Sequence, residues 1–195
     1  MKHTIELRKG ALSAVALFAA KKDARYYRHG VFIETGPKGA ILVATDGYAL
    51  AAMHAPADCE VSAGVVPIEL ISNAIKTSKG DKLYLTIDTD HPTATGQPMY
   101  TIAGMHAQGI DGRFPEWRRV VPTCEPSCVA AQFDPELVSR FGKAAKLLGK
   151  KSTSVCVAHN GPEQAARVLI DSSPDFLGVI MPYWRKANTD VPDWF

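Results

Sequence analysis

The sequence lacks any long hydrophobic run. Its longest apolar stretch, Ala14 to Ala20, is far shorter than the roughly 20 residues that a membrane-spanning helix requires. Together with Met1 and Lys2 it imitates a secretory signal, but Lys21-Lys22-Asp23 follows it, which is typical of the end of an amphipathic helix and not of a cleavage site. We therefore expect a cytoplasmic, unprocessed protein without a membrane segment.

Cysteine is also scarce. Cys59, Cys124, Cys128 and Cys156 are too few and too scattered for a disulfide framework in 195 residues, so reduced thiols are expected. The spacing of Cys124 and Cys128 is that of half a zinc site, but no second Cys/His pair stands nearby at ligand spacing. We expect no structural metal.

Catalytic motifs are missing as well. No glycine-rich phosphate loop follows a predicted strand, and neither Ser172-Ser173 nor the cysteines have an identifiable base partner. The rival enzyme interpretation is a metal hydrolase, whose candidate ligands stand at no known ligand spacing: His54, His91, His106, Asp88 and Asp90. We expect no catalytic residue and no cofactor.

Net charge is small, but its distribution is uneven. The chain has 22 Lys and Arg against 20 Asp and Glu, a formal charge of +2. The windows 1–30, 67–82 and 134–151 hold 15 of the basic and 6 of the acidic side chains, a net of +9, which leaves −7 for the remainder. These windows are also the best helix candidates, so the pattern favours helices that face a polyanion. The alternative is that Lys and Arg simply solvate helix faces and helix C-termini.

A helix followed by strands recurs three times. Asp134 and Pro135 are typical of a helix start, and apolar residues then recur at helical spacing as far as Leu148. A second helix follows Pro67 and ends near Gly80, and a third spans Ala11 to about Lys22. Glu69-Leu70-Ile71-Ser72 and Glu136-Leu137-Val138-Ser139 are 67 residues apart and alike.

Strand-like runs complete the repeat. Each predicted helix is preceded by one run and followed by three, which indicates a βαβββ unit repeated at about 60 to 67 residues. The leading strands are expected at Thr4–Leu7, Ser62–Val66 and Val129–Phe133. The predicted class is α+β, with units over 1–60 and 61–122 forming one domain, a third unit over 127–185, and a tail over 186–195.

Three segments resemble a known family. They are Asp23 to Gly30 (DARYYRHG), Val43 to Ala51 (VATDGYALA) and Asp111 to Pro122 (DGRFPEWRRVVP). In order and spacing they are similar to the middle domain of the bacterial DNA polymerase III β subunit, the sliding clamp. Val179 to Pro182 is similar to the last strand of that family.

The resemblance implies the DNA-clamp fold, a ring of βαβββ units with helices lining a hole around duplex DNA and sheets outside. It implies sequence-independent contact with double-stranded DNA, which needs diffuse positive charge. Arg25, Tyr26 and Tyr27 match the loop that touches DNA in the family. The basic side chains expected on the helices are Lys9, Lys21, Lys22, Lys76, Lys79, Arg140, Lys143, Lys146 and Lys150.

The resemblance also implies a cleft for short hydrophobic peptides of polymerases and repair proteins. The matching positions are Thr45, Gly47, Tyr48, Leu50, Pro115, Arg119, Val120, Val179, Met181, Pro182 and Tyr183. The chain departs from the family at Arg28, where an apolar residue is usual, and at Ala49, where Arg is frequent. Ordinary core packing is the alternative for Leu50, Val120 and Val179.

Chain length sets the remaining expectations. Family protomers carry six units and pair to make twelve, so three units predict a homotetrameric ring, with polymerase, other clamp-binding-motif proteins and a clamp loader as partners. The alternative is a truncated clamp homologue that regulates a full-length clamp and its clients. The tail ends in Trp194-Phe195, an aromatic pair for which docking in a hydrophobic cleft is one hypothesis and a disordered tail is the alternative.

Overall fold

The structure is a computed structural model of the chain. It describes residues 1–21, 25–57, 64–90, 95–123, 129–149, 154–159 and 161–183. The predicted aromatic tail lies outside the described residues. No helix in the described part of the chain is long and apolar enough to cross a membrane.

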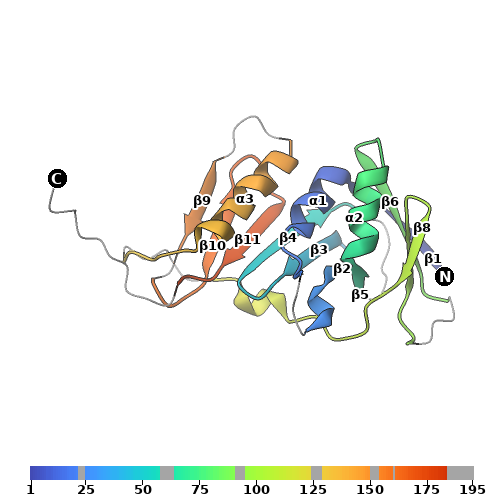
Figure 1. Cartoon of the computed structure of the whole chain (residues 1–195), viewed down its shortest axis with the longest axis horizontal. Helices are drawn as coiled ribbons and strands as arrows, with labels where there is room; N and C mark the ends of the chain where they lie inside the picture. Colours follow the sequence, from blue (N-terminus) through green and yellow to red (C-terminus); the bar gives the residue numbers. More distant parts are fainter. Residues whose placement is uncertain are drawn as a thin grey trace.

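The first two units have the predicted element order (Figure 1). The first contains β1 (Lys2–Arg8), α1 (Lys9–Ala16), the 3-10 turn η1 (Tyr26–Arg28), β2 (Gly30–Gly36), β3 (Gly39–Thr45) and β4 (Ala49–Ala55). The second contains β5 (Gly64–Pro67), α2 (Ile68–Thr77), β6 (Lys82–Asp88), β7 (Met99–Ile102) and β8 (Met105–Gln108), followed by η2 (Trp117–Val120). Helix α1 ends earlier than predicted, because the chain turns at Phe18, whose N–H bonds the Val15 carbonyl at 3.0 Å.

The third unit consists of α3 (Pro135–Leu147), β9 (Val155–Ala158), β10 (Ala166–Ile170) and β11 (Phe176–Ile180). The predicted helix start is confirmed, since Asp134 accepts a hydrogen bond from the Glu136 N–H at 2.8 Å and Pro135 is the first helical residue. The predicted leading strand at Val129–Phe133 is wrong: these residues form no strand. A strand requires a partner edge, and in the other units that edge belongs to a neighbouring unit.

Two antiparallel sheets carry the fold, in the orders β1-β6-β7-β8 and β5-β2-β3-β4-β11-β10-β9. The first two units exchange their leading strands, because β1 pairs with β6 of the second unit and β5 pairs with β2 of the first. The third unit joins the first through β4 and β11, with Leu50 opposite Val179. One sheet therefore runs continuously from the first unit into the third.

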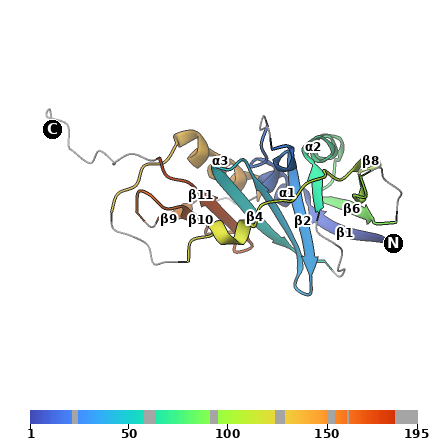
Figure 2. The same cartoon turned by 90° about the horizontal axis from the view of Figure 1, so that it is seen from below.

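The three helices cover one side of the sheets, with α1 between α2 and α3 (Figures 1 and 2). The core lies beneath them and joins the first and third units. Phe18, which follows α1, lies 4.8 Å from Phe141 of α3 and 6.5 Å from Phe176 of β11, measured between ring centroids. All three rings are buried. The η2 turn lies on the opposite side of the sheet from the helices (Figure 2).

Candidate functional site

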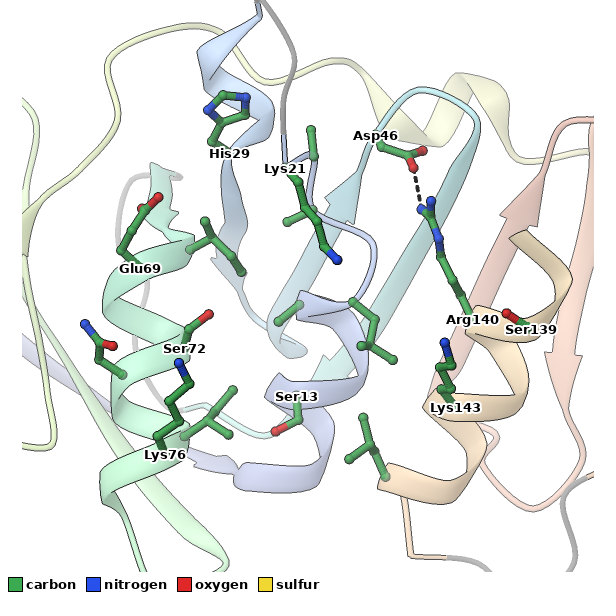
Figure 3. Close-up of a pocket in the computed structure, with 18 of the residues that line it drawn as sticks. Ser13, Lys21, His29, Asp46, Glu69, Ser72, Lys76, Ser139, Arg140 and Lys143 are labelled. Atoms are coloured by element: carbon green, nitrogen blue, oxygen red, sulfur yellow. Dashed lines mark hydrogen bonds and ion pairs between the residues drawn. The ribbon is translucent and has the colours of Figure 1, made fainter. Parts of the chain in front are cut away.

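The helices enclose a broad groove of about 1110 Å³, lined by residues of α1, α2 and α3 (Figure 3). Four of the predicted DNA-facing cations line it: Lys21 after α1, Lys76 on α2, and Arg140 and Lys143 on α3. Lys21, Lys76 and Lys143 are exposed. In Figure 3, Lys76 and Lys143 project from the two outer helices on either side of α1. The tertiary structure thus gathers basic residues that are up to 122 positions apart, from 21 to 143.

The groove is less positive than the sequence windows suggest. Three carboxylates, Asp46, Glu69 and Glu136, also line it, so the four cations leave a net charge of +1. Arg140 forms an ion pair with Asp46, and both side chains are largely shielded, at 29% and 16% exposure. The basic groups available to an outside anion are therefore the lysines on the groove walls.

The other predicted DNA-facing residues are placed differently. Lys9 makes a hydrogen bond within the protein: its Nζ donates to the carbonyl of Ser78, just beyond the end of α2, at 2.6 Å. Lys79 and Lys146 are exposed but outside the groove lining, as is Arg25, and Tyr27 is half-buried. Lys22, Lys150 and the side chain of Tyr26 lie outside the described residues.

A second, smaller cleft of about 120 Å³ lies where β4 meets β11. Most of the predicted peptide-cleft residues line it: Thr45, Gly47, Tyr48, Leu50, Pro115, Val120, Val179 and Met181. They come from the β3–β4 turn, from the segment around η2 and from β11. Three segments that are far apart in the sequence therefore meet in one place.

The β3–β4 turn is held by its own side chains. Thr45 Oγ1 donates to the Ala49 carbonyl at 2.9 Å and accepts from the Gly47 N–H at 3.0 Å. Asp46 Oδ1 accepts from the N–H groups of Tyr48 and Ala49, at 2.9 and 3.0 Å. Gly47 has a φ of +96°, a conformation that side-chain-bearing residues rarely adopt. The Ala-Thr-Asp-Gly sequence thus fixes one wall of the cleft.

The turn also connects the two candidate sites. Asp46 uses one carboxylate oxygen for the turn and the other for Arg140, which lines the helical groove. Arg28 lies against the same turn, and its guanidinium donates to the Asp46 carbonyl at 3.3 Å. Arg28, which departs from the family pattern, is therefore part of the cleft lining.

Sequence reasoning missed Glu116 and Trp117 in the cleft lining. Trp117 is 8% exposed, and the Arg118 guanidinium carbon lies 4.4 Å from its ring centroid. Arg118 in turn bonds Glu34 of β2, with one N···O distance of 3.2 Å, and this carboxylate raises the pKa of the guanidinium. These contacts hold the η2 segment on the sheet. The tryptophan within Asp111 to Pro122 was the available signal.

Three predicted cleft residues do not line the cleft. Arg119 is exposed and lies 3.6 Å from the Glu116 carboxylate, while Pro182 and Tyr183 lie beyond the end of β11. The Tyr183 N–H donates to the Gln132 carbonyl at 2.7 Å, which holds this segment beside the residues that precede α3.

Apolar side chains surround the cleft without being buried. Tyr48, Val120 and Met181 are 68%, 50% and 41% exposed. Beneath them, Leu50 and Val179 are buried in a core cluster with Trp117. Exposed apolar groups around a concave apolar site are typical of a binding site for a small apolar ligand or peptide.

The candidate ligands for a metal hydrolase are not gathered. Asp88 lies 3.6 Å from Lys2, Asp90 pairs with the amino terminus, and His54 contacts the Lys38 carbonyl. His91 lies outside the described residues. Within the described ranges, no group of three or more His, Cys, Asp and Glu side chains is placed to hold a metal ion.

Comparison with curated proteins gives a consistent set of relatives. The chain is 27% identical over 182 residues to the β sliding clamp of Vibrio cholerae, which covers 85% of this chain and 48% of that protein. It is 28% identical over 170 residues to the β sliding clamp of Escherichia coli K12, covering 80% and 45%. This chain is a relative of the bacterial β sliding clamps. It spans about half the length of the curated relatives it matches, and no family model matches it.

Solved clamp structures share the fold of this sliding clamp relative. The DNA polymerase III β subunit of Thermotoga maritima superposes with a TM-score of 0.69 at 13% identity, over 93% of this chain and 65% of that chain. The corresponding subunit from Borrelia burgdorferi gives 0.68 at 11% identity, over 92% and 64%. The predicted α+β DNA-clamp fold is confirmed.

Proposed function

We propose that this β-clamp relative is a DNA sliding clamp, a processivity factor that surrounds duplex DNA and tethers polymerase or repair proteins. The observation that carries the proposal is the row of three helices with Lys76 and Lys143 on the walls of one groove. The sheets lie on the other side, as an outer wall requires.

Contact with DNA in this proposal involves the phosphate backbone alone. Exposed lysines on rigid helices provide positive charge without reading base edges, so they permit sliding along any sequence. The carboxylates in the groove limit the attraction and keep contacts weak enough to exchange. Such a role needs no bond-breaking chemistry, so we propose that the protein is not an enzyme.

A ring requires several copies of this chain. If the twelve-unit ring implied by the resemblance is kept, four chains of 21.1 kDa, 84.4 kDa in total, complete it. Loading such a closed ring on DNA would require a partner that opens it, the role of a clamp loader.

The cleft beside β11 is proposed as the docking site for a short hydrophobic peptide of the tethered protein. Replacing Met181 with Asp should weaken binding of such a peptide by at least about tenfold, because a carboxylate would have to be desolvated against the apolar cleft. Fluorescence anisotropy with a labelled apolar peptide measures the change. Leu169→Asp is the matched control, since Leu169 of β10 is 42% exposed, like Met181, but lies outside the cleft lining. Equal losses in both variants would contradict the assignment.

Retention on circular DNA tests the proposal. The protein, with a loader fraction if needed, should remain on nicked circular duplex during gel filtration in moderate salt and should be lost after the circle is linearised. Equal retention on both forms would indicate ordinary electrostatic binding. No binding to either form, with binding to a full-length β clamp or its clients, would favour the alternative, a clamp homologue that regulates a full-length clamp.

A further inference from the structure

The sheet of the third unit ends in an open edge. Among the described residues, β9 pairs with β10 alone and occupies the end of the seven-stranded sheet. Val155 and Val157 are only half-buried, and Cys156 between them is exposed. In the first unit, the corresponding strand β2 buries Val31 and Ile33. An edge strand with apolar residues is an incomplete surface that can accept another strand.

The first two units show how such an edge is completed. Seven residues of β1, Lys2 to Arg8, pair with β6 of the second unit, and β5 of the second unit returns the exchange on β2. In both cases the donated strand immediately precedes the helix of its own unit. Two units therefore complete each other by a reciprocal exchange.

The third unit has both parts required for this exchange. Residues 129–133 precede α3 as β1 precedes α1, yet they form no strand, and Val129 is 59% exposed. Helix α3 also has an apolar residue that is partly exposed. Val138 is 37% exposed, whereas Ile71, at the matching place in α2, is 1% exposed. The third unit thus lacks a neighbour on the side where the first two units contact each other.

We infer that the missing neighbour is the third unit of a second copy of this chain. Within residues 129–133 of each copy, residues 129–131 would pair antiparallel with Val155, Cys156 and Val157 of β9 in the other copy. A second copy fits because each copy owns one donor segment and one acceptor edge, so a single two-fold contact satisfies both. This inference names an interface of the ring proposed above and rests on that proposal for its biological role.

The register of the exchange follows from the first two units. Leu85 of β6 pairs with Ile5 and with Ile102, the last residue of β7. Val155 pairs with Ile170, the last residue of β10, and so takes the place of Leu85. Counted back from the first residue of each helix, Ala131 takes the place of Ile5.

One residue along, the pair is Ala130 opposite Cys156. Their counterparts are Thr4 and Thr86, whose hydroxyl oxygens lie 3.0 Å apart on the exposed face of the sheet. Side chains at this register position therefore touch. A cysteine at position 130 should meet Cys156 of the second copy.

Disulfide cross-linking tests the inference on the full chain. Cys59, Cys124 and Cys128 are replaced with Ser, Cys156 is kept, and Ala130→Cys is added. Mild oxidation should convert most of the protein to a covalent dimer of 42.2 kDa, twice 21.1 kDa, on non-reducing gels. Because two identical bonds join the dimer, no free thiol should remain. Ala131→Cys is the matched control, since adjacent strand residues point to opposite faces, and it should give little dimer.

Other outcomes overturn the inference. A disulfide within one chain, equal dimer yields from both variants, or a persistent monomer would each show that β9 does not accept this segment of a second copy. Light scattering of the unmodified chain gives its oligomeric state, which tests the four-chain ring independently of the strand exchange. If the unmodified chain is a tetramer but the cross-link does not form, the four-chain ring is supported and the strand exchange is wrong. If the cross-link forms efficiently but the unmodified chain is a dimer, the exchange is supported and the four-chain ring is contradicted.

Discussion

Replacing Phe141 with Ala should lower the free energy of unfolding by about 3–5 kcal/mol. The ring is 1% exposed and contacts Phe18 of the first unit and Phe176 of the third, with centroid distances of 4.8 and 6.4 Å. The Phe141 ring is closely packed against β11, since a Cβ added at Gly178 would lie 2.3 Å from Phe141 Cε1. The substitution therefore leaves a cavity at the junction of the two units, which urea denaturation followed by circular dichroism measures.

Leu147→Ala is the control for this prediction. Leu147 is on the same helix but is 42% exposed, so its loss should cost less than about 1 kcal/mol. A similar cost for both variants would show that α3 is not anchored by the aromatic cluster. A large loss for Phe141 with two separate unfolding transitions would show that the third unit unfolds independently of the first.

Replacing both Lys76 and Lys143 with Ala should weaken DNA binding. Each is an exposed cation on a wall of the groove, and each such contact is worth about 0.5–1 kcal/mol. The double Ala variant should bind duplex DNA roughly 5 to 30-fold more weakly at low salt. The slope of log affinity against log salt should fall by about 2, because two phosphate contacts are lost. Anisotropy titrations at several salt concentrations measure both effects.

Two matched variants show whether position or charge alone matters. Lys38→Ala removes an exposed cation from the β2–β3 turn, outside the groove, and should leave both affinity and slope nearly unchanged. Lys9→Ala removes the bond to the Ser78 carbonyl and should reduce stability more than DNA binding. If Lys38→Ala weakened binding as much as loss of one groove lysine, the groove would not be the DNA-facing surface.

Local features of the fold were predictable because they depend on nearby residues. Asp134 and Pro135 start α3 as expected, since an N-cap acceptor and a preset φ act within one turn. The Ala-Thr-Asp-Gly turn is likewise determined by its own Thr45 and Asp46 side chains. The positions of most strands followed from short apolar runs, because the side chains of strands such as β3 and β4 are largely buried.

The contacts within the two candidate sites could not be predicted from the sequence, because they join segments that are far apart along the chain. Arg140 and Lys9 were predicted as DNA-facing cations. Arg140 instead pairs with Asp46, 94 residues away, and Lys9 donates to the carbonyl of Ser78, 69 residues away. Trp117 joins the cleft because it packs with Leu50 of β4 and Val179 of β11, which are far from it in the sequence.

Helices, turns and the recurrence of one pattern along the chain follow from the local sequence. The pairing of each strand with a particular edge depends on the tertiary structure, which is why residues 129–133 form no strand while the equivalent β1 and β5 do. The physical reason is that helix and turn hydrogen bonds close within a few residues, whereas a strand's backbone groups are satisfied only by a partner whose identity local sequence does not specify.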